Sequence, residues 1–147
     1  TLFRSKIMHY LGGKFMNHIV ISEKLPDTNK YIKLRKEVGW GTLDIEVTRK
    51  GISNSCYCLY VECEDSLVEF GRVVGDGATV FYVHDIIVST KFQKQKIGIR
   101  IMKKIMEYIR MNCLEGAFVG LIAKGDLYNF YKKFGFTYNE NNRFYRL

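Results

Sequence analysis

The chain has 147 residues, of which 47% are hydrophobic and 14% aromatic, which is enough for one domain with a real core and too few for two comfortable ones. No apolar run approaches the ~20 residues that a membrane-spanning helix needs, and no signal-peptide pattern opens the chain, so we expect a cytoplasmic protein with no membrane contact. The formal net charge of +8 favours an anionic partner.

The four cysteines lack the paired spacing with histidine partners that is typical of zinc sites. In a chain with no secretion signal, we expect them to be reduced core residues rather than a disulfide framework. The sequence therefore predicts no metal site. These residues are Cys56, Cys58, Cys63 and Cys113.

The first 15 residues carry Arg4, Lys6 and Lys14 and no acid, and they match no recognisable start of a helix or strand. Residues 12–16 can be encoded by a bacterial ribosome-binding sequence followed, at a suitable spacing, by a start codon. Our hypothesis is that residues 1–15 are an upstream-translated leader of a bacterial protein. Residues 16–147 would then form a single domain that starts at Met16.

The predicted elements begin with a strand over residues 17–23. Pro26 and Asp27 predict a break and a helix cap, and Gly39 is expected to end the helix that follows. Residues 40–50 are compatible with a second short helix that closes over a ligand. Strand-like runs at about 56–62, 67–74 and 79–88 are separated by two favourable turn sequences and predict an antiparallel meander. The turns are Glu64-Asp65 and Gly75-Asp76-Gly77.

The rest of the chain alternates helix and strand. Apolar residues at helical spacing predict a helix over 98–112 that buries one face against a sheet. Residues 117–123 predict a buried strand, residues 126–134 a short helix stopped by Gly135, and residues 136–147 a final strand or hairpin. The expected class is α/β (α+β), with a mixed, mostly antiparallel central sheet flanked by helices.

The junction between the strand at 79–88 and the helix at 98–112 predicts an anion site. The first-turn N–H groups of a helix are unpaired and lie at the positive end of the helix dipole, where a phosphate group fits. Lys94 and Lys96 add positive charge, and Gly98 permits a close backbone approach. An ordinary solvated turn is the other interpretation of this pattern.

The segment TKFQKQKIGIRIM resembles the acetyl-CoA-binding motif of the GNAT superfamily of N-acetyltransferases, Gln/Arg-x-x-Gly-x-Gly/Ala. Gln93 takes the first position and Gly98 the last, while Lys96 replaces the middle glycine. Residues 120–136 are similar to a later motif of the family. They match it at Phe130, Tyr131, Gly135 and Phe136, with Lys124 where the family often has asparagine.

This resemblance covers Met16 to Leu147 and implies the GNAT fold with acetyl-CoA as cosubstrate. It implies that pantetheine pairs with the backbone of Ile86, Ile87 and Val88. It also implies that N–H groups of the following loop bind the pyrophosphate. The loop residues are Gln93, Lys94, Gln95, Lys96, Ile97, Gly98 and Ile99, with a possible extension to Arg100.

The resemblance also implies catalytic residues. Tyr131 matches the tyrosine that acts as general acid in many relatives, although it could equally be a packing aromatic. Strand alternation predicts that Tyr82, His84, Ile86 and Val88 share one face of the sheet. His84 matches a histidine position of some arylalkylamine acetyltransferases and suits a base at neutral pH, but a structural histidine or water-relayed deprotonation would serve as well. Asp85 is the next candidate for a catalytic role, and it could instead bind a cationic amine or support the sheet.

The expected activity is direct transfer of the acetyl group from acetyl-CoA to a primary amine in a ternary complex. Tyr31, Trp40 and Tyr82 are the expected substrate-binding residues, and the acceptor, a small amine or a peptide amine, stays unidentified. The alternatives are a basic nucleic-acid-binding module, for which no recognised motif is present, and a catalytically idle acetyl-CoA sensor. Pairing into a homodimer is left open.

Overall fold

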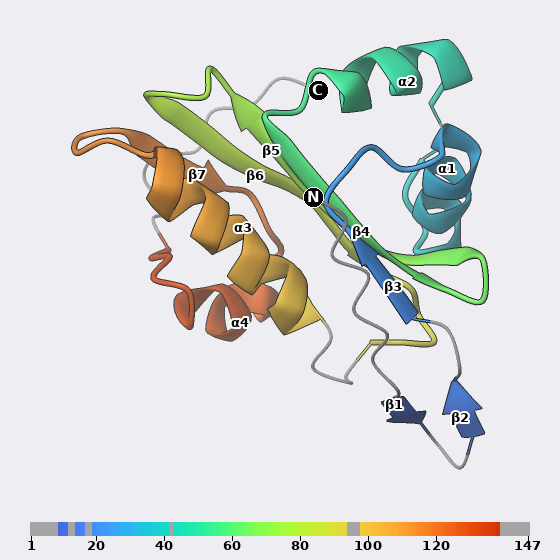
Figure 1. Cartoon of the computed structure of the whole chain (residues 1–147). Coiled ribbons are helices and arrows are strands. Elements are labelled where there is room, and N and C mark those ends of the chain that lie inside the picture. Colours follow the sequence, from blue (N-terminus) through green and yellow to red (C-terminus); the bar gives the residue numbers. More distant parts are fainter. Residues whose placement is uncertain (1–8, 12–13, 17–18, 42, 94–97, 139–147) are drawn as a thin grey trace.

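A five-stranded sheet forms the centre of the molecule, with α1 and α2 on one face and α3 and α4 on the other (Figure 1). The computed structural model describes residues 9–11, 14–16, 19–41, 43–93 and 98–138. The strands are β1 (His9–Leu11), β2 (Lys14–Met16), β3 (Ile19–Ser22), β4 (Tyr57–Cys63), β5 (Ser66–Gly75), β6 (Val80–Val88) and β7 (Phe118–Leu121). The helices are α1 (Thr28–Glu37), α2 (Ile45–Ser53), α3 (Gly98–Asn112) and α4 (Tyr128–Lys132), the last preceded by a 3-10 turn at Gly125–Leu127.

The order of strands in this sheet is β3-β4-β5-β6-β7. The first four are antiparallel neighbours, and β7 runs parallel to β6. The prediction of a mixed, mostly antiparallel sheet is therefore confirmed.

The two helices on the α1 face start at side-chain caps. Asp27 accepts a hydrogen bond from the Lys30 backbone N–H at 2.9 Å, as the sequence predicts for the first helix. Gly39 follows that helix with a φ of +80°, a left-handed conformation that favours glycine. Residues 40–50 are compatible with a second short helix, and the structure forms one that is capped by Asp44 and shifted toward the C-terminus, from Ile45 to Ser53.

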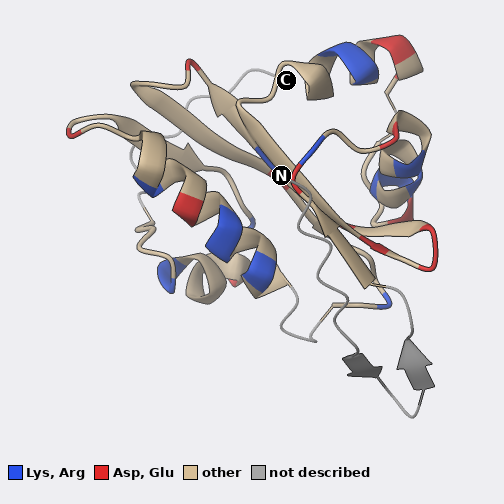
Figure 2. Cartoon of the chain, viewed as in Figure 1, with Lys and Arg blue, Asp and Glu red and all other residues tan. Residues whose placement is uncertain are grey.

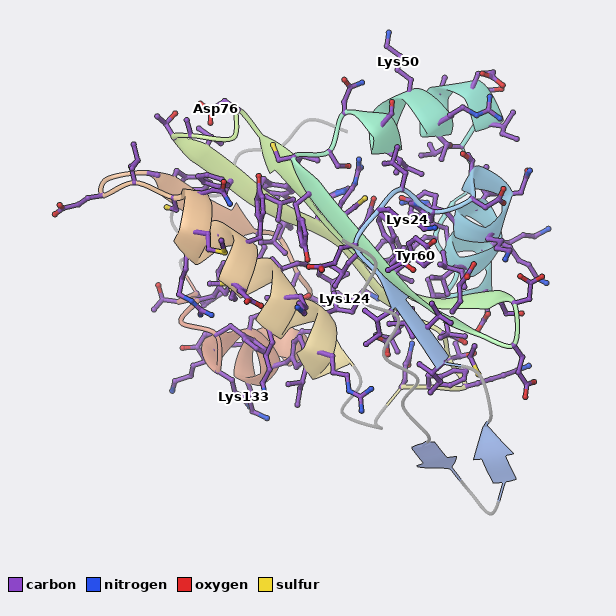
Figure 3. The ribbon with its side chains drawn as sticks, in the orientation of Figure 1. Lys24, Lys50, Tyr60, Asp76, Lys124 and Lys133 are labelled. Atoms are coloured by element: carbon purple, nitrogen blue, oxygen red, sulfur yellow. The ribbon has the colours of Figure 1, made fainter. Side chains whose placement is uncertain are left out.

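The meander is confirmed, and its turns show why. Glu64 and Asp65 both have positive φ, as a tight hairpin between twisted strands requires. At the β5–β6 turn the Asp76 carboxylate accepts hydrogen bonds from three successive backbone N–H groups, which fixes the loop (Figure 3).

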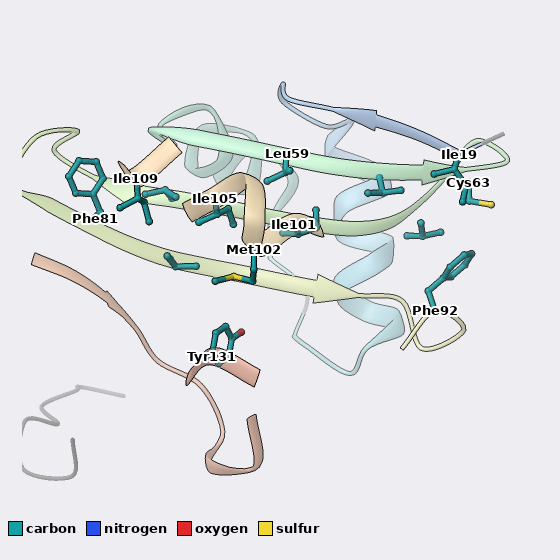
Figure 4. Close-up of a cluster of buried hydrophobic side chains, with 14 residues drawn as sticks. Ile19, Leu59, Cys63, Phe81, Phe92, Ile101, Met102, Ile105, Ile109 and Tyr131 are labelled. Carbon is teal, nitrogen blue, oxygen red and sulfur yellow. The ribbon is translucent and has the colours of Figure 1, made fainter. Parts of the chain in front are cut away.

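Each face of the sheet has its own hydrophobic core. On the α3 face, buried residues of α3 pack on β4, β5 and β6, and Tyr131 of α4 joins them near Met102 (Figure 4). On the α1 face, Tyr31 and Leu34 pack against Phe70 and Ile87. The predicted burial of one face of the helix at 98–112 is confirmed at Ile101, Met102, Ile105 and Ile109.

The predicted alternation along residues 82–88 is wrong, because β6 contains a β-bulge. Phe70 pairs with Ile87 and Arg72 with His84, so two residues of β6 lie opposite the single residue Gly71. Asp85, one of these two residues, has a φ of +53°. Ahead of the bulge Phe81 and Val83 face the α3 core, whereas after it Ile86 and Val88 do so, and Ile87 faces the α1 core.

Two further expectations need correction. The first 15 residues do contain strands, since β1 and β2 pair with each other as a separate two-stranded sheet. Residues 136–138 form no strand, and residues 139–147, the rest of the expected terminal strand or hairpin, lie outside the described residues. The leader hypothesis stays a prediction.

All four cysteines are free thiols. The described part of the chain holds no group of three or more histidine, cysteine or acidic side chains that could bind a metal. Within the same residues, no helix is both long and apolar enough to cross a bilayer.

Candidate functional site

A cavity of about 1000 Å³ opens beside the C-terminal half of β6. Its walls come from β6, the end of β7, the first turn of α3, α4 and the segment that follows α1. Both the predicted base and the predicted acid line this one cavity, as His84 and Tyr131.

The backbone of β6 is open toward the cavity. β7 pairs with β6 only from Val80 to Val83, so within the described residues the edge from His84 to Val88 has no neighbouring strand on that side. Extended chains bind such edges by backbone hydrogen bonds. Ile86, Ile87 and Val88 all line the cavity, although the bulge directs their side chains to different cores.

The N-terminus of α3 closes one end of this edge. Gly98 is the first residue of α3, and a Cβ at Gly98 would lie 3.4 Å from Val88 Cγ2 and 3.7 Å from Phe130 Cζ. Gln93 turns its side chain back, so that Nε2 donates to the Val88 carbonyl at 3.0 Å. Ile99 also lines the cavity, whereas the predicted loop residues Lys94, Gln95, Lys96 and Ile97 lie outside the described residues.

Two lysines add positive charge to the lining of the cavity. Lys124 follows β7 and Lys133 follows α4. Asp126 lines the cavity as well. An extended open strand edge, a helix N-terminus and two lysines around a cavity of this size suit acetyl-CoA, whose pantetheine is extended and whose phosphates are anionic.

Asp85 is the centre of a buried polar cluster. Because the bulge turns its side chain toward α1, Asp85 accepts hydrogen bonds from Tyr31 Oη at 2.6 Å, Arg35 Nη1 at 3.1 Å and Arg72 Nε at 2.9 Å. Burial alone would raise the pKa of Asp85, but the hydrogen bonds from His84 and Tyr31 and the charge of Arg72 hold it at about 2. The carboxylate is 1% exposed, and this geometry favours the support role over direct contact with an amine.

His84 lies between this cluster and the cavity. Its Nδ1 is 3.2 Å from Asp85 Oδ1 and 3.3 Å from Arg72 Nη2, while 43% of its side chain is exposed. If Nδ1 carries the ring proton and donates a hydrogen bond to the Asp85 carboxylate, the unprotonated Nε2 can accept a proton from a molecule in the cavity.

Tyr131 extends from α4 into the α3 core and the cavity (Figure 4). Burial raises the pKa of its hydroxyl, so the phenol keeps its proton at neutral pH. A protonated phenol at a cavity wall can donate a proton, which is the property required of a general acid.

Of the three expected substrate-binding residues, two line the cavity and one lies behind its wall. Trp40 and Tyr82 line the cavity, and the Tyr82 and His84 rings have centroids 5.6 Å apart. Tyr31 lies one layer behind the wall, where burial and the hydrogen bond to Asp85 raise its pKa to about 12. The contribution of Tyr31 to the site is therefore indirect, through Asp85.

Sequence reasoning missed Arg35 and Arg72. Arg35 supports the wall as well as Asp85, since its guanidinium lies 5.3 Å from the centre of the Trp40 ring and donates to the Gly41 carbonyl. Arg35 follows Tyr31 by four residues, a spacing that places both on one side of a helix and could have indicated a shared partner. Arg72 carried no such signal, because its meeting with Asp85 depends on the bulge.

The sequence model of a family described as "Acetyltransferase (GNAT) domain" matches residues 54–138. Among curated proteins, the chain is similar to an uncharacterized N-acetyltransferase, ycf52, of Gracilaria tenuistipitata var. liui. The two are 27% identical over 136 residues, which are 88% of this chain and 74% of the relative.

Solved structures agree with this match. A probable acetyltransferase of unknown function from meticillin-resistant Staphylococcus aureus, SA2161, is 33% identical, with a TM-score of 0.81 over 88% of this chain and 98% of that one. A GNAT family acetyltransferase from Streptococcus pneumoniae TIGR4, SP0256, is 27% identical, with a TM-score of 0.68 over 82% of this chain and 88% of that one.

Proposed function

Because the chain belongs to the GNAT acetyltransferase family and is therefore an acetyl-CoA-dependent acyltransferase, we propose that it transfers an acetyl group to a primary amine in the cavity beside β6. The transfer occurs directly in a ternary complex. The observation that carries this proposal is the open edge of β6, which joins the N-terminus of α3 to His84 and Tyr131 along one cavity.

The proposed chemistry needs two proton movements. Acetyl-CoA supplies a thioester, from which the acetyl carbon forms a bond to the amine nitrogen as its bond to sulfur breaks. His84 Nε2 accepts a proton from the attacking amine, and the Asp85 carboxylate orients the ring through Nδ1. Tyr131 Oη donates the proton that the departing sulfur receives.

The distribution of charge supports an enzyme rather than a nucleic-acid-binding module. Lys and Arg residues lie on helices on both faces of the sheet (Figure 2). A nucleic-acid-binding domain typically gathers its basic residues on one face or along one helix. The spread of basic residues therefore gives no support to a nucleic-acid-binding surface.

The location of the cofactor site is tested at Gly98. Replacing Gly98 by Val would place branched methyl groups between Val88 and Phe130, at the N–H groups of the first turn of α3. We expect the Kd of acetyl-CoA, measured by calorimetric titration, to rise by about 10-fold or more, on the order of 1.4 kcal/mol. An unchanged Kd in a folded Gly98→Val protein would place the pyrophosphate elsewhere.

The role of His84 is tested by the pH dependence of kcat/KM for an amine that the protein acetylates. His84→Gln retains a polar side chain but cannot accept the proton of the amine. We expect turnover to fall by about 10²-fold or more and the acid limb of the profile to disappear. An acid limb identical to that of the wild type would return His84 to a structural role.

A further inference from the structure

The last residue of α1, Glu37, accepts hydrogen bonds from the two residues that follow β6, where the predicted pyrophosphate-binding loop begins. Glu37 Oε1 accepts hydrogen bonds from Ser89 Oγ at 2.6 Å, from Thr90 Oγ1 at 3.0 Å and from the Thr90 backbone N–H at 3.0 Å. Glu37 and these partners are more than 50 positions apart in sequence. One carboxylate oxygen thus fixes two successive residues directly after β6.

Ser89 in turn forms backbone hydrogen bonds with the residues that follow it, up to Gln93. The Ser89 carbonyl accepts from the Phe92 N–H at 2.8 Å and the Gln93 N–H at 3.1 Å, and the Ser89 N–H donates to the Val68 carbonyl. Ser89 is only 2% exposed, so its hydroxyl depends on a protein partner. The conformation from Ser89 to Gln93 is therefore built around a residue that Glu37 anchors.

The charge of Glu37 suits this role. The hydrogen bond from Ser89 is the largest effect that lowers the pKa of Glu37 below its ordinary value, so the side chain is a carboxylate at neutral pH. Hydrogen bonds to a charged acceptor are about twice as strong as those between neutral groups. The anchor is not needed to close the hydrophobic core, because α1 packs on the sheet through Tyr31 and Leu34.

We propose that Glu37 is a positioning residue for acetyl-CoA: it sets the backbone between Ser89 and Gln93 so that the entrance to the pyrophosphate loop is formed before the cofactor binds. This rests on the proposed location of the cofactor site. Glu37 belongs to the same helix that holds Asp85 through Tyr31 and Arg35, so α1 supports the cofactor end and the catalytic end of the cavity together.

The test is calorimetric titration of folded Glu37→Ala protein with acetyl-CoA, together with steady-state kinetics. We expect the Kd of acetyl-CoA to rise by about 10-fold or more, because without the Glu37 carboxylate the backbone between Ser89 and Gln93 must be ordered when the cofactor binds. At saturating acetyl-CoA, kcat and the KM of the amine should stay within about threefold of the wild type, since His84 and Tyr131 are untouched. Glu37→Gln should restore part of the affinity, because its amide oxygen can accept hydrogen bonds at the same place but lacks the charge that strengthens them.

A matched control is Glu107→Ala, which removes an exposed glutamate of α3 whose partner is Lys104 at 3.7 Å. It should leave the Kd unchanged. An unchanged Kd in Glu37→Ala, or a fall in kcat without a change in Kd, would overturn the proposal. If Gly98→Val binds normally as well, the location of the cofactor site is at fault rather than the role of Glu37.

A second variant tests the proposal even if Glu37→Ala does not fold. Thr90→Val removes one donor to Glu37 at an exposed position and keeps the shape of the side chain. We expect its acetyl-CoA Kd to rise by about threefold, the effect of one hydrogen bond. A Kd equal to that of the wild type would contradict the proposal.

Discussion

Burial of the Tyr131 phenol raises its pKa, and this has a chemical consequence beyond packing. A phenol that keeps its proton is a donor over the whole neutral range. Its place in the α3 core also limits the orientations that the ring can adopt. The same contacts that stabilise the fold therefore keep the hydroxyl protonated and hold the ring in place.

Tyr131→Phe separates these two effects. The ring and its packing remain, while the proton that the sulfur would receive is lost. We expect kcat to fall by about 10²-fold and the Kd of acetyl-CoA to change by less than about threefold. Equal turnover in the variant would remove Tyr131 from the acid role and leave it as a core residue.

Glu69 is a second buried acid, and it lies on β5 opposite Val88. It is 0% exposed, and neither carboxylate oxygen has a hydrogen-bond partner among the described residues. Burial raises the pKa of Glu69 to about 8, against an opposing effect of the nearby Arg100 charge. A protonated, neutral Glu69 is the form that this environment favours.

This shift predicts that folding stability declines as pH rises. The unfolded chain loses the Glu69 proton near pH 4.5 and the folded chain near pH 8, so in this interval the folded state binds more protons. Glu69→Gln, which is neutral at every pH, should lack this decline. Urea unfolding at pH 5 and pH 8.5 should show the variant gaining on the wild type by a few kcal/mol at the higher pH. If the free energies of unfolding of the two proteins change equally between pH 5 and pH 8.5, the raised pKa of Glu69 is contradicted.

The bulge in β6 depends on the strand beside it. A Cβ on Gly71 would lie 2.5 Å from Ile101 Cγ2, 2.9 Å from Ile86 Cδ1 and 3.0 Å from Ile105 Cδ1. The residue opposite the bulge must therefore lack a side chain for α3 to reach the sheet. Sheet irregularity and helix packing are coupled at this point.

Gly71→Ala tests that coupling. We expect the free energy of unfolding to fall by about 1–3 kcal/mol, because the added methyl group overpacks the contact between α3 and β5. Gly51→Ala is the matched control, since α2 has open space at that position and alanine should stabilise the helix by up to about 1 kcal/mol. Equal effects of the two substitutions in denaturant unfolding would show that the contact at Gly71 can relax freely.

The elements that the sequence predicts well are those set by local chemistry. Asp27, Gly39 and the Glu64-Asp65 turn specify their boundaries through nearby backbone groups, and the apolar spacing of α3 needs only one partner face. The prediction of which face the side chains after His84 point to is wrong, because the bulge arises from the pairing of β5 with β6 and cannot be seen in the sequence of either strand alone.

The candidate site shows the same division. Residues that line the cavity through their own strand or helix, such as His84, Gly98 and Tyr131, could be found from the chain and its resemblance to a family. Arg72 and Glu37 act through partners that are distant in sequence, and only the folded chain brings these groups together.

In the whole molecule the sheet separates two hydrophobic cores, and the groups that form or support the cavity come from both faces of the sheet. The α3 face contributes the helix N-terminus and the acid, and the α1 face contributes the support of Asp85 and Glu37. The reacting groups therefore keep their relative positions only if both helical layers are docked on the sheet.

The bulge at Asp85 also changes which residues of β6 face each side of the sheet. Before the bulge the odd-numbered Phe81 and Val83 face the α3 core, and after it the odd-numbered Ile87 faces the α1 core. If β6 ran in regular alternation through Asp85, the same sequence would place Asp85 and Ile87 on the α3 face and Ile86 and Val88 on the α1 face. The bulge is thus what allows two successive residues, His84 and Asp85, to lie on the same side of β6, with the imidazole at the cavity and the carboxylate beside its Nδ1.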